Sequence, residues 1–142
     1  MIEVKVTFSG LKIEELKLES TIKQLIQNLA EYAERTMRSE APERTGRLKS
    51  SIKRKVKGYS AEIGPETPYS IFVELGTRPH VITPVYAHTL RFEVGGEMVF
   101  TKIVHHPGTK PNPFVRRTAD KTMNFIPSAW KKVWGGVATG LL

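Results

Sequence analysis

Few side chains in this sequence combine the chemistry and the spacing that catalysis or metal binding requires. The four histidines, His80, His88, His105 and His106, form no metal-binding motif, and the adjacent pair would point in opposite directions on a strand. Asp120 is the one aspartate, cysteine is absent, and no nucleophile-elbow, phosphate-loop or dinucleotide-binding pattern occurs. We therefore predict no catalytic residue, no metal site, no cofactor and no enzymatic activity.

Glu74 is the remaining candidate for chemistry, because it lies in the apolar stretch FVELG. A carboxylate in such a setting can serve as an acid or a base, which would make the protein a small hydrolase with a histidine or glutamate site. It can also cap a turn or pair with a nearby arginine. We favour the structural interpretation of Glu74. A small hydrolase ranks third among the possible functions, after the two that are given below.

Positive charge is concentrated in two blocks. The chain has 142 residues, with 22 Lys+Arg against 14 Asp+Glu and a net charge of +8. Residues 44–57 carry 7 basic and 0 acidic side chains, and residues 98–142 carry 7 and 1. Such blocks are compatible with contact to nucleic acid or to an acidic protein surface, although a solvated basic face is the commoner explanation. Because no zinc-finger, RNP, KH or helix-turn-helix signature is present, we do not expect base-specific recognition.

The elements that must position these groups follow from hydrophobic periodicity. Residues 2–8 alternate between apolar and polar side chains, which predicts a strand. Residues 11–18 are expected to form the connection from this strand to the first helix. Apolar residues at helical spacing predict a helix that begins at a capping box at Thr21 and ends at Pro42. A short turn from Thr45 to Ser51 and a β-hairpin over residues 52–63 follow.

The second half of the chain is more mixed. Residues 68–76 fit a strand and a helix equally well. A second hairpin is expected between Leu90 and Val104, because Gly95-Gly96 suits a turn in which both residues have positive φ. The proline-rich residues 105–113 are expected to form a loop.

The last predicted element is a helix from Phe114, with Asn112 as its N-cap. Pro127 should kink or split it, and Gly135-Gly136 should end it. The whole order predicts an α+β fold, in which the N-terminal strand and two hairpins form a mostly antiparallel sheet packed with the two long helices. We expect a single domain over residues 1–142, with residues 135–142 as a flexible tail.

No apolar run approaches the ~18 residues that a transmembrane helix needs, and the N-terminus does not have the pattern of a signal peptide. We therefore expect a protein of a cytoplasm-like compartment that makes no contact with a membrane.

Three segments are specific enough to indicate a family. They are APERTGRLKSSI (residues 41–52), YSIFVELGTRPHVITP (residues 69–84) and VHHPGTKPNPFVRRTAD (residues 104–120). In this order, after a helix and with a hairpin between the second and third, they resemble the neck or tail-completion proteins of tailed phages, a gene-ten-product-like tail-component family also called minor capsid proteins. The resemblance extends from about Leu25 to Ala119.

The resemblance implies a non-enzymatic virion structural protein of the head-tail junction, assembling as a ring around the DNA channel. Its partners would be like subunits, the adjoining head-completion and tail proteins and, transiently, passing DNA. It would lie in the virion, and in the host cytoplasm during assembly. The alternative is a cytoplasmic non-specific nucleic-acid-binding protein.

The resemblance also implies contact surfaces in the Gly- and Pro-rich segments 76–84 and 105–113. A turn-forming role explains Gly46, Gly76 and Gly108 equally well. The residues expected to contact like subunits or neighbours are Arg44, Arg47, Glu74, Thr77, Arg78, His106, Lys110 and Phe114.

Three lysines, Lys53, Lys55 and Lys57, should share one face of a strand. In a ring they would line the DNA channel, or they would meet an acidic surface of an adjoining ring. Simple solvation of the three charges is the third interpretation.

Overall fold

The computed structural model describes residues 2–8 and 16–138 of the chain. The described residues form an α+β fold with antiparallel sheets and long N- and C-terminal helices, which confirms the predicted fold class. The elements are β1 (Val4–Thr7), α1 (Leu16–Glu40), α2 (Arg47–Ser51), β2 (Ile52–Lys57), β3 (Ser60–Pro65), α3 (Ser70–Leu75), β4 (His80–Ile82), β5 (Leu90–Val94), β6 (Glu97–Thr101), β7 (Val104–His106) and α4 (Phe114–Ala138).

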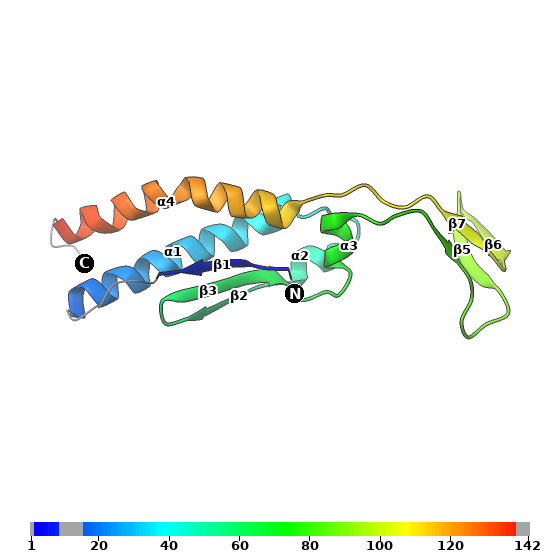
Figure 1. The fold of residues 1–142 in the computed structure, drawn as a ribbon, viewed down its shortest axis with the longest axis horizontal. Helices are drawn as coiled ribbons and strands as arrows, with labels where there is room; N and C mark the ends of the chain where they lie inside the picture. Colours follow the sequence, from blue (N-terminus) through cyan, green and yellow to red (C-terminus); the bar gives the residue numbers. More distant parts are fainter. Residues whose placement is uncertain (1, 9–15, 139–142) are drawn as a thin grey trace.

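The body of the molecule is built on α1, which packs against a three-stranded sheet and against α4. The sheet has the order β1-β3-β2, and α1 and α4 run side by side along it (Figure 1). One stripe of α1 is buried against the sheet and includes Ile22, Ile26 and Met37. A neighbouring stripe, Leu25 and Leu29, packs with Ala129 and Val133 of α4. The apolar residues of α1, spaced with the 3.6-residue period of a helix, therefore pack against both the sheet and α4.

Residues 77–109 leave the body as a projecting arm (Figure 1). Its stem is the antiparallel pair β4–β7, in which His80 lies opposite His106 and Ile82 opposite Val104. Beyond the stem, β5 and β6 form a separate two-stranded hairpin around Gly95-Gly96, as the two glycines predicted.

The arm changes the predicted arrangement of strands. The second hairpin does not join the sheet of the body, and part of the expected loop 105–113 is the strand β7. The stem joins segments more than twenty residues apart, and its short strands are stabilised by each other rather than by local propensity. Periodicity within a window of the sequence therefore could not detect them.

The first helix begins earlier than predicted. α1 starts at Leu16, whereas residues 11–15 of the expected connection lie outside the described residues. Thr21 is buried within the helix and is not its cap. No helix breaker lies between Leu16 and Thr21, and Glu19 forms an ion pair with Lys23 one turn later, at 2.7 Å, which supports the added turn.

Pro127 does not split the last helix, and Gly135-Gly136 does not end it. α4 runs unbroken to Ala138, and residues 139–142 of the expected tail lie outside the described residues. Pro127 is exposed on the side of α4 away from α1, where water can bind the carbonyl group that loses its helical partner. Packing of Ala129 and Val133 onto α1 holds the helix together beyond the proline.

We expect Leu29→Ala to lower the free energy of unfolding by about 2 to 5 kcal/mol, because Leu29 is buried between α1 and α4. Gln27→Ala, on the exposed side of α1, is the matched control and should change it by less than about 0.5 kcal/mol. Urea unfolding followed by circular dichroism measures both, and equal effects would contradict this packing.

Candidate interaction site at the root of the arm

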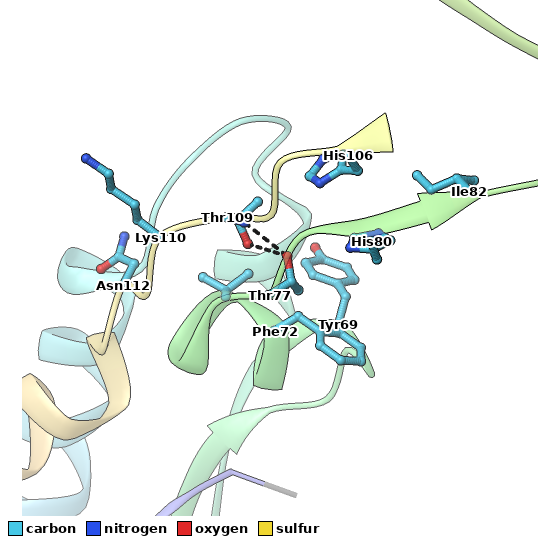
Figure 2. Close-up of a pocket in the computed structure, with 10 residues that line it drawn as sticks. Tyr69, Phe72, Thr77, His80, Ile82, His106, Thr109, Lys110 and Asn112 are labelled. Carbon is cyan, nitrogen blue, oxygen red and sulfur yellow. Dashed lines mark hydrogen bonds between the residues drawn. The ribbon is translucent and has the colours of Figure 1, made fainter. Parts of the chain in front are cut away.

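Two Gly-Thr dipeptides meet where the arm joins the body. The amide of Thr77 donates to the carbonyl oxygen of Thr109 at 3.0 Å, and the amide of Thr109 donates back to that of Thr77 at 3.1 Å. Their hydroxyl groups lie 3.1 Å apart (Figure 2). We call this reciprocal pair the root bridge. It brings together segments of the sequence that are 32 residues apart.

The glycines before these threonines permit the close approach. Gly76 and Gly108 have φ of +71° and +84°, in the left-handed region that favours glycine. A Cβ on Gly76 would lie 2.5 Å from the Thr109 carbonyl oxygen, and one on Gly108 would lie 2.3 Å from that of Thr77. Both glycines are therefore needed for the backbone geometry of the root bridge.

Glu74, at the end of α3, caps α4. Its carboxylate accepts hydrogen bonds from the backbone amides of Val115 at 2.9 Å and Arg116 at 3.1 Å, in the first turn of α4. The first amides of a helix lack helical partners and carry partial positive charge, so a buried carboxylate is well placed there. The carboxylate of Glu74 therefore binds backbone amides, which is a structural contact of the capping kind.

Asn112 does not perform the capping predicted for it. Its side-chain oxygen accepts a hydrogen bond from the guanidinium group of Arg117 at 2.7 Å, and its amide donates to the Val73 carbonyl at 2.9 Å. The N-cap of α4 is supplied by a residue 41 positions earlier in the sequence, which local capping rules cannot identify.

Glu40, the last residue of α1, ties that helix to α4. Arg117 donates to its carboxylate at 2.6 Å and to its backbone carbonyl at 3.2 Å, and Lys121 donates to the other carboxylate oxygen. The hydrogen bond from Lys121, followed by that from Arg117, holds the pKa of Glu40 below its ordinary value of 4.5. This network fixes α1 and α4 next to the root bridge.

An open, mainly apolar pocket of about 450 Å³ lies beside the root bridge (Figure 2). The rings of His80 and His106, which come from opposite strands of the stem, stack on its arm side with centroids 4.9 Å apart. Phe72 of α3 lines it and is 58% exposed. The full lining is Tyr69, Phe72, Val73, Thr77, His80, Ile82, His106, Thr109, Lys110 and Asn112.

The structure gathers some of the predicted contact residues here. Thr77, His106 and Lys110 line the pocket. Arg78 comes directly after Thr77 in the sequence, and its side chain is exposed. Arg44 lines an adjacent cavity of about 310 Å³ that shares Tyr69 and Val73 with the pocket.

The other predicted residues lie elsewhere. Arg47 is exposed at the start of α2. Glu74 and Phe114 are buried inside the chain, and Phe114 belongs to the core of the body. Within the chain Glu74 joins α3 to the start of α4, and contact of these two side chains with a neighbour stays a prediction.

The lysine face has the predicted geometry. Lys53, Lys55 and Lys57 are all exposed on one face of β2, while Arg54 on the opposite face reaches Glu34 of α1 at 3.3 Å. Lys55 lies 3.9 Å from Glu66. This face of the sheet is not covered by either long helix (Figure 1).

Several lining residues were not identified from the sequence, namely Tyr69, Phe72, Ile82, Thr109 and Asn112. One signal was present, because the dipeptide Gly-Thr occurs at residues 76–77 and again at residues 108–109. Their contact depends on the pairing of β4 with β7, which the sequence did not reveal.

The described part of the chain holds no group of three or more residues arranged to bind a metal ion, and none of its helices is both long and apolar enough to cross a bilayer. The pocket can accept apolar side chains, with hydrogen-bonding groups from threonine, histidine and lysine at its edge. These properties suit protein binding.

Residues 11–76 match the HK97-gp10-like family, described as "Bacteriophage HK97-gp10, putative tail-component". No curated protein and no solved structure matches the chain. The family resemblance is therefore confirmed, with different limits from those predicted. The match begins before Leu25 and ends at Gly76, so it includes residues 41–52, reaches only partly into residues 69–84 and leaves out residues 104–120.

This match supports a structural role as a phage tail component, a virion location and contacts with other virion proteins. A structural family of this kind points to a protein that is not an enzyme. The alternative of a cytoplasmic nucleic-acid-binding protein gains no support from it.

We expect Gly108→Ala to destabilise the root bridge more than Gly58→Ala destabilises the β2–β3 turn. Gly58 also has positive φ, but a Cβ there meets nothing within 4 Å. Gly58→Ala therefore measures only the cost of placing alanine in a left-handed conformation, about 1 kcal/mol. Gly108→Ala adds a clash that forces two hydrogen bonds open, for a total of about 3 kcal/mol. Amide exchange at Thr77 and Thr109 reports the opening, and unchanged protection there would contradict the steric argument.

We expect Glu40→Gln to lower the free energy of unfolding by about 1 to 2 kcal/mol at pH 7, because it removes the charge that Arg117 and Lys121 bind. The pKa of Glu40 is lowered on folding, so this stabilisation is present above pH 4.5 and is lost as the pH falls through the lower folded value.

Urea unfolding of the wild type and Glu40→Gln should therefore give curves that converge toward pH 3. Glu43→Gln removes an exposed carboxylate that pairs with Lys49, and its effect should be clearly smaller than that of Glu40→Gln. A Glu40→Gln effect that persists unchanged at pH 3 would show that charge is not its cause.

Proposed function

We propose that this chain, which matches the HK97-gp10-like tail-component family over residues 11–76, is a non-enzymatic structural subunit of the phage head-tail junction. In this proposal, identical copies form a ring around the DNA channel and contact the adjoining head-completion and tail proteins. The protein reaches the virion from the host cytoplasm during assembly.

The observation that carries the proposal is the exposed apolar surface of the arm. Val85 and Tyr86, in the loop between β4 and β5, are 79% and 101% exposed, and Phe100 of β6 is 62% exposed. Apolar groups gathered on a projecting element favour a partner that removes them from water. An arm on one side and an apolar pocket at its root give each copy two unlike surfaces, as head-to-tail ring contacts require.

The lysine face supports a position close to DNA or to an acidic ring. Lys53, Lys55 and Lys57 point away from α1. Weak, non-specific attraction to phosphates would let DNA pass while offsetting its repulsion from acidic surfaces. Contact with an acidic neighbouring ring is the second role that this face fits.

Location in the particle tests the proposal directly. Mass spectrometry of purified virions should detect the chain, and electron microscopy should place it as a ring between portal and tail. If the chain is absent from virions that contain the other neck and tail proteins, the structural proposal fails.

We expect a charge-reversed triple variant, Lys53→Glu, Lys55→Glu and Lys57→Glu, to lower the titre of infectious particles. If the face meets DNA, particles should assemble but retain or eject DNA poorly, whereas contact with an acidic ring predicts heads and tails that fail to join. Each exposed contact is worth only ~0.2 to 1 kcal/mol, so all three are changed together.

The matched control reverses the same amount of charge on exposed residues of α4: Arg116→Glu, Lys131→Glu and Lys132→Glu. It should leave DNA retention and head-tail joining closer to those of the parent. Normal titre and normal joining in the Lys53, Lys55 and Lys57 variant would exclude both roles of the lysine face.

A further inference from the structure

The β5–β6 hairpin has two open edges. It is a two-stranded sheet, and within the described chain its strands make no backbone hydrogen bond beyond their own ladder. All residues from Arg91 to Met98 are exposed. A hairpin of two strands alone is marginally stable in water, so this one gains by further pairing.

The turn determines which backbone groups are free to pair. Gly95 and Gly96 both have positive φ, and Val94 lies opposite Glu97, so this closing pair exchanges hydrogen bonds across the two-residue turn. Pairs in an antiparallel ladder alternate, and the next pair, Glu93 with Met98, is therefore not hydrogen-bonded. Its amide and carbonyl groups point outward, as do those of Arg91 and Phe100, which are opposite each other two residues further along.

These edges lack several of the usual protections against pairing. The five residue pairs from Leu90–Thr101 to Val94–Glu97 continue without a bulge, and residues 90–101 contain neither proline nor lysine. Natural edge strands commonly use such features to block association. Arg91, Glu93 and Glu97 place charges on the strands, but no bulge or proline interrupts either edge, so both edges stay regular.

We propose that hairpins of neighbouring copies pair edge to edge, with β6 of one copy against β5 of the next. This inference rests on the ring proposed above and specifies one of its contacts. Rotation about an axis parallel to the strands leaves strand direction unchanged. Because β5 and β6 run in opposite directions, β5 of the next copy then lies antiparallel to β6 and continues the sheet.

A second copy suits these edges better than an unrelated strand does. One foreign strand would pair with one edge and leave the other open. Copies related by rotation cover both edges of every hairpin, and a closed ring leaves no free edge. The same chain also supplies both halves of the contact, since its two edges belong to different strands.

Cysteine cross-linking tests this pairing, because the parent chain has no cysteine. Single substitutions are made at the four residues with outward backbone groups: Arg91→Cys and Glu93→Cys on β5, and Met98→Cys and Phe100→Cys on β6. Particles are assembled from two differently tagged copies, one carrying a β5 cysteine and the other a β6 cysteine. The four mixtures sample an in-register pairing and shifts of two residues in either direction.

Paired strands place Cα atoms about 4.5 to 5.5 Å apart, within the range that a disulfide spans. We expect a cross-linked dimer of unlike tags in at least one mixture, and none in particles that carry only β5 or only β6 cysteines. Cross-links in the β5-only particles would indicate a symmetric contact and overturn the proposal. Absence of cross-links from all mixtures would overturn it as well.

A backbone variant provides a second test. Met98→Pro removes an outward amide and leaves the hydrogen bonds of the hairpin intact, whereas Met98→Thr changes the side chain and keeps the amide. We expect loss of assembly or of cross-linking at β6 with Met98→Pro and retention with Met98→Thr. Equal behaviour of the two variants would overturn edge pairing.

Electron microscopy of the same particles separates this inference from the proposed function. Rings that form without cross-links in any mixture would exclude the hairpin contact while keeping the ring. Absence of the chain from the particles would exclude the ring itself.

Discussion

The root bridge between Thr77 and Thr109 is the contact on which the rest of the arm depends. It closes a 32-residue excursion of the chain with two backbone hydrogen bonds that only glycine at positions 76 and 108 permits. On the body side, Glu74, three residues before Thr77, holds the start of α4, and Glu40 anchors the same helix to α1. The direction in which the arm leaves is thus set by the exposed root bridge together with the buried Glu74 cap and the partly buried Glu40 ion pair.

The body could be predicted from the sequence because its elements are long and locally consistent. The apolar stripe of α1 indicates a helix, and the alternation in β2 and β3 indicates strands. The packing of α1 on the sheet buries the same apolar residues that these patterns identify. The ends of the long helices were harder to predict, because α1 starts before the capping box at Thr21 and α4 continues past Gly135-Gly136. Packing of α1 against α4 outweighed the tendency of Pro127 to break a helix.

The candidate site was predicted less completely, for a physical reason. Its residues come from α3, from both strands of the stem and from the segment before α4, and only the β4–β7 pairing brings them together. The sequence identified Thr77, His106 and Lys110 through a family resemblance, but it could not show that Glu74 caps a helix 41 residues away. Local patterns report which residues are unusual, whereas long-range pairing decides what they touch.

The root bridge also makes the stability of the body largely independent of the length of the arm. The entropy of closing a flexible segment grows slowly with length, by about 0.6 kcal/mol for each doubling. Because the root bridge and the Glu74 cap secure both ends of the excursion, the chain between Thr77 and Thr109 can lengthen, shorten or change its sequence at little thermodynamic cost to the helices and sheet. The same body of helices and sheet therefore tolerates arms of different length.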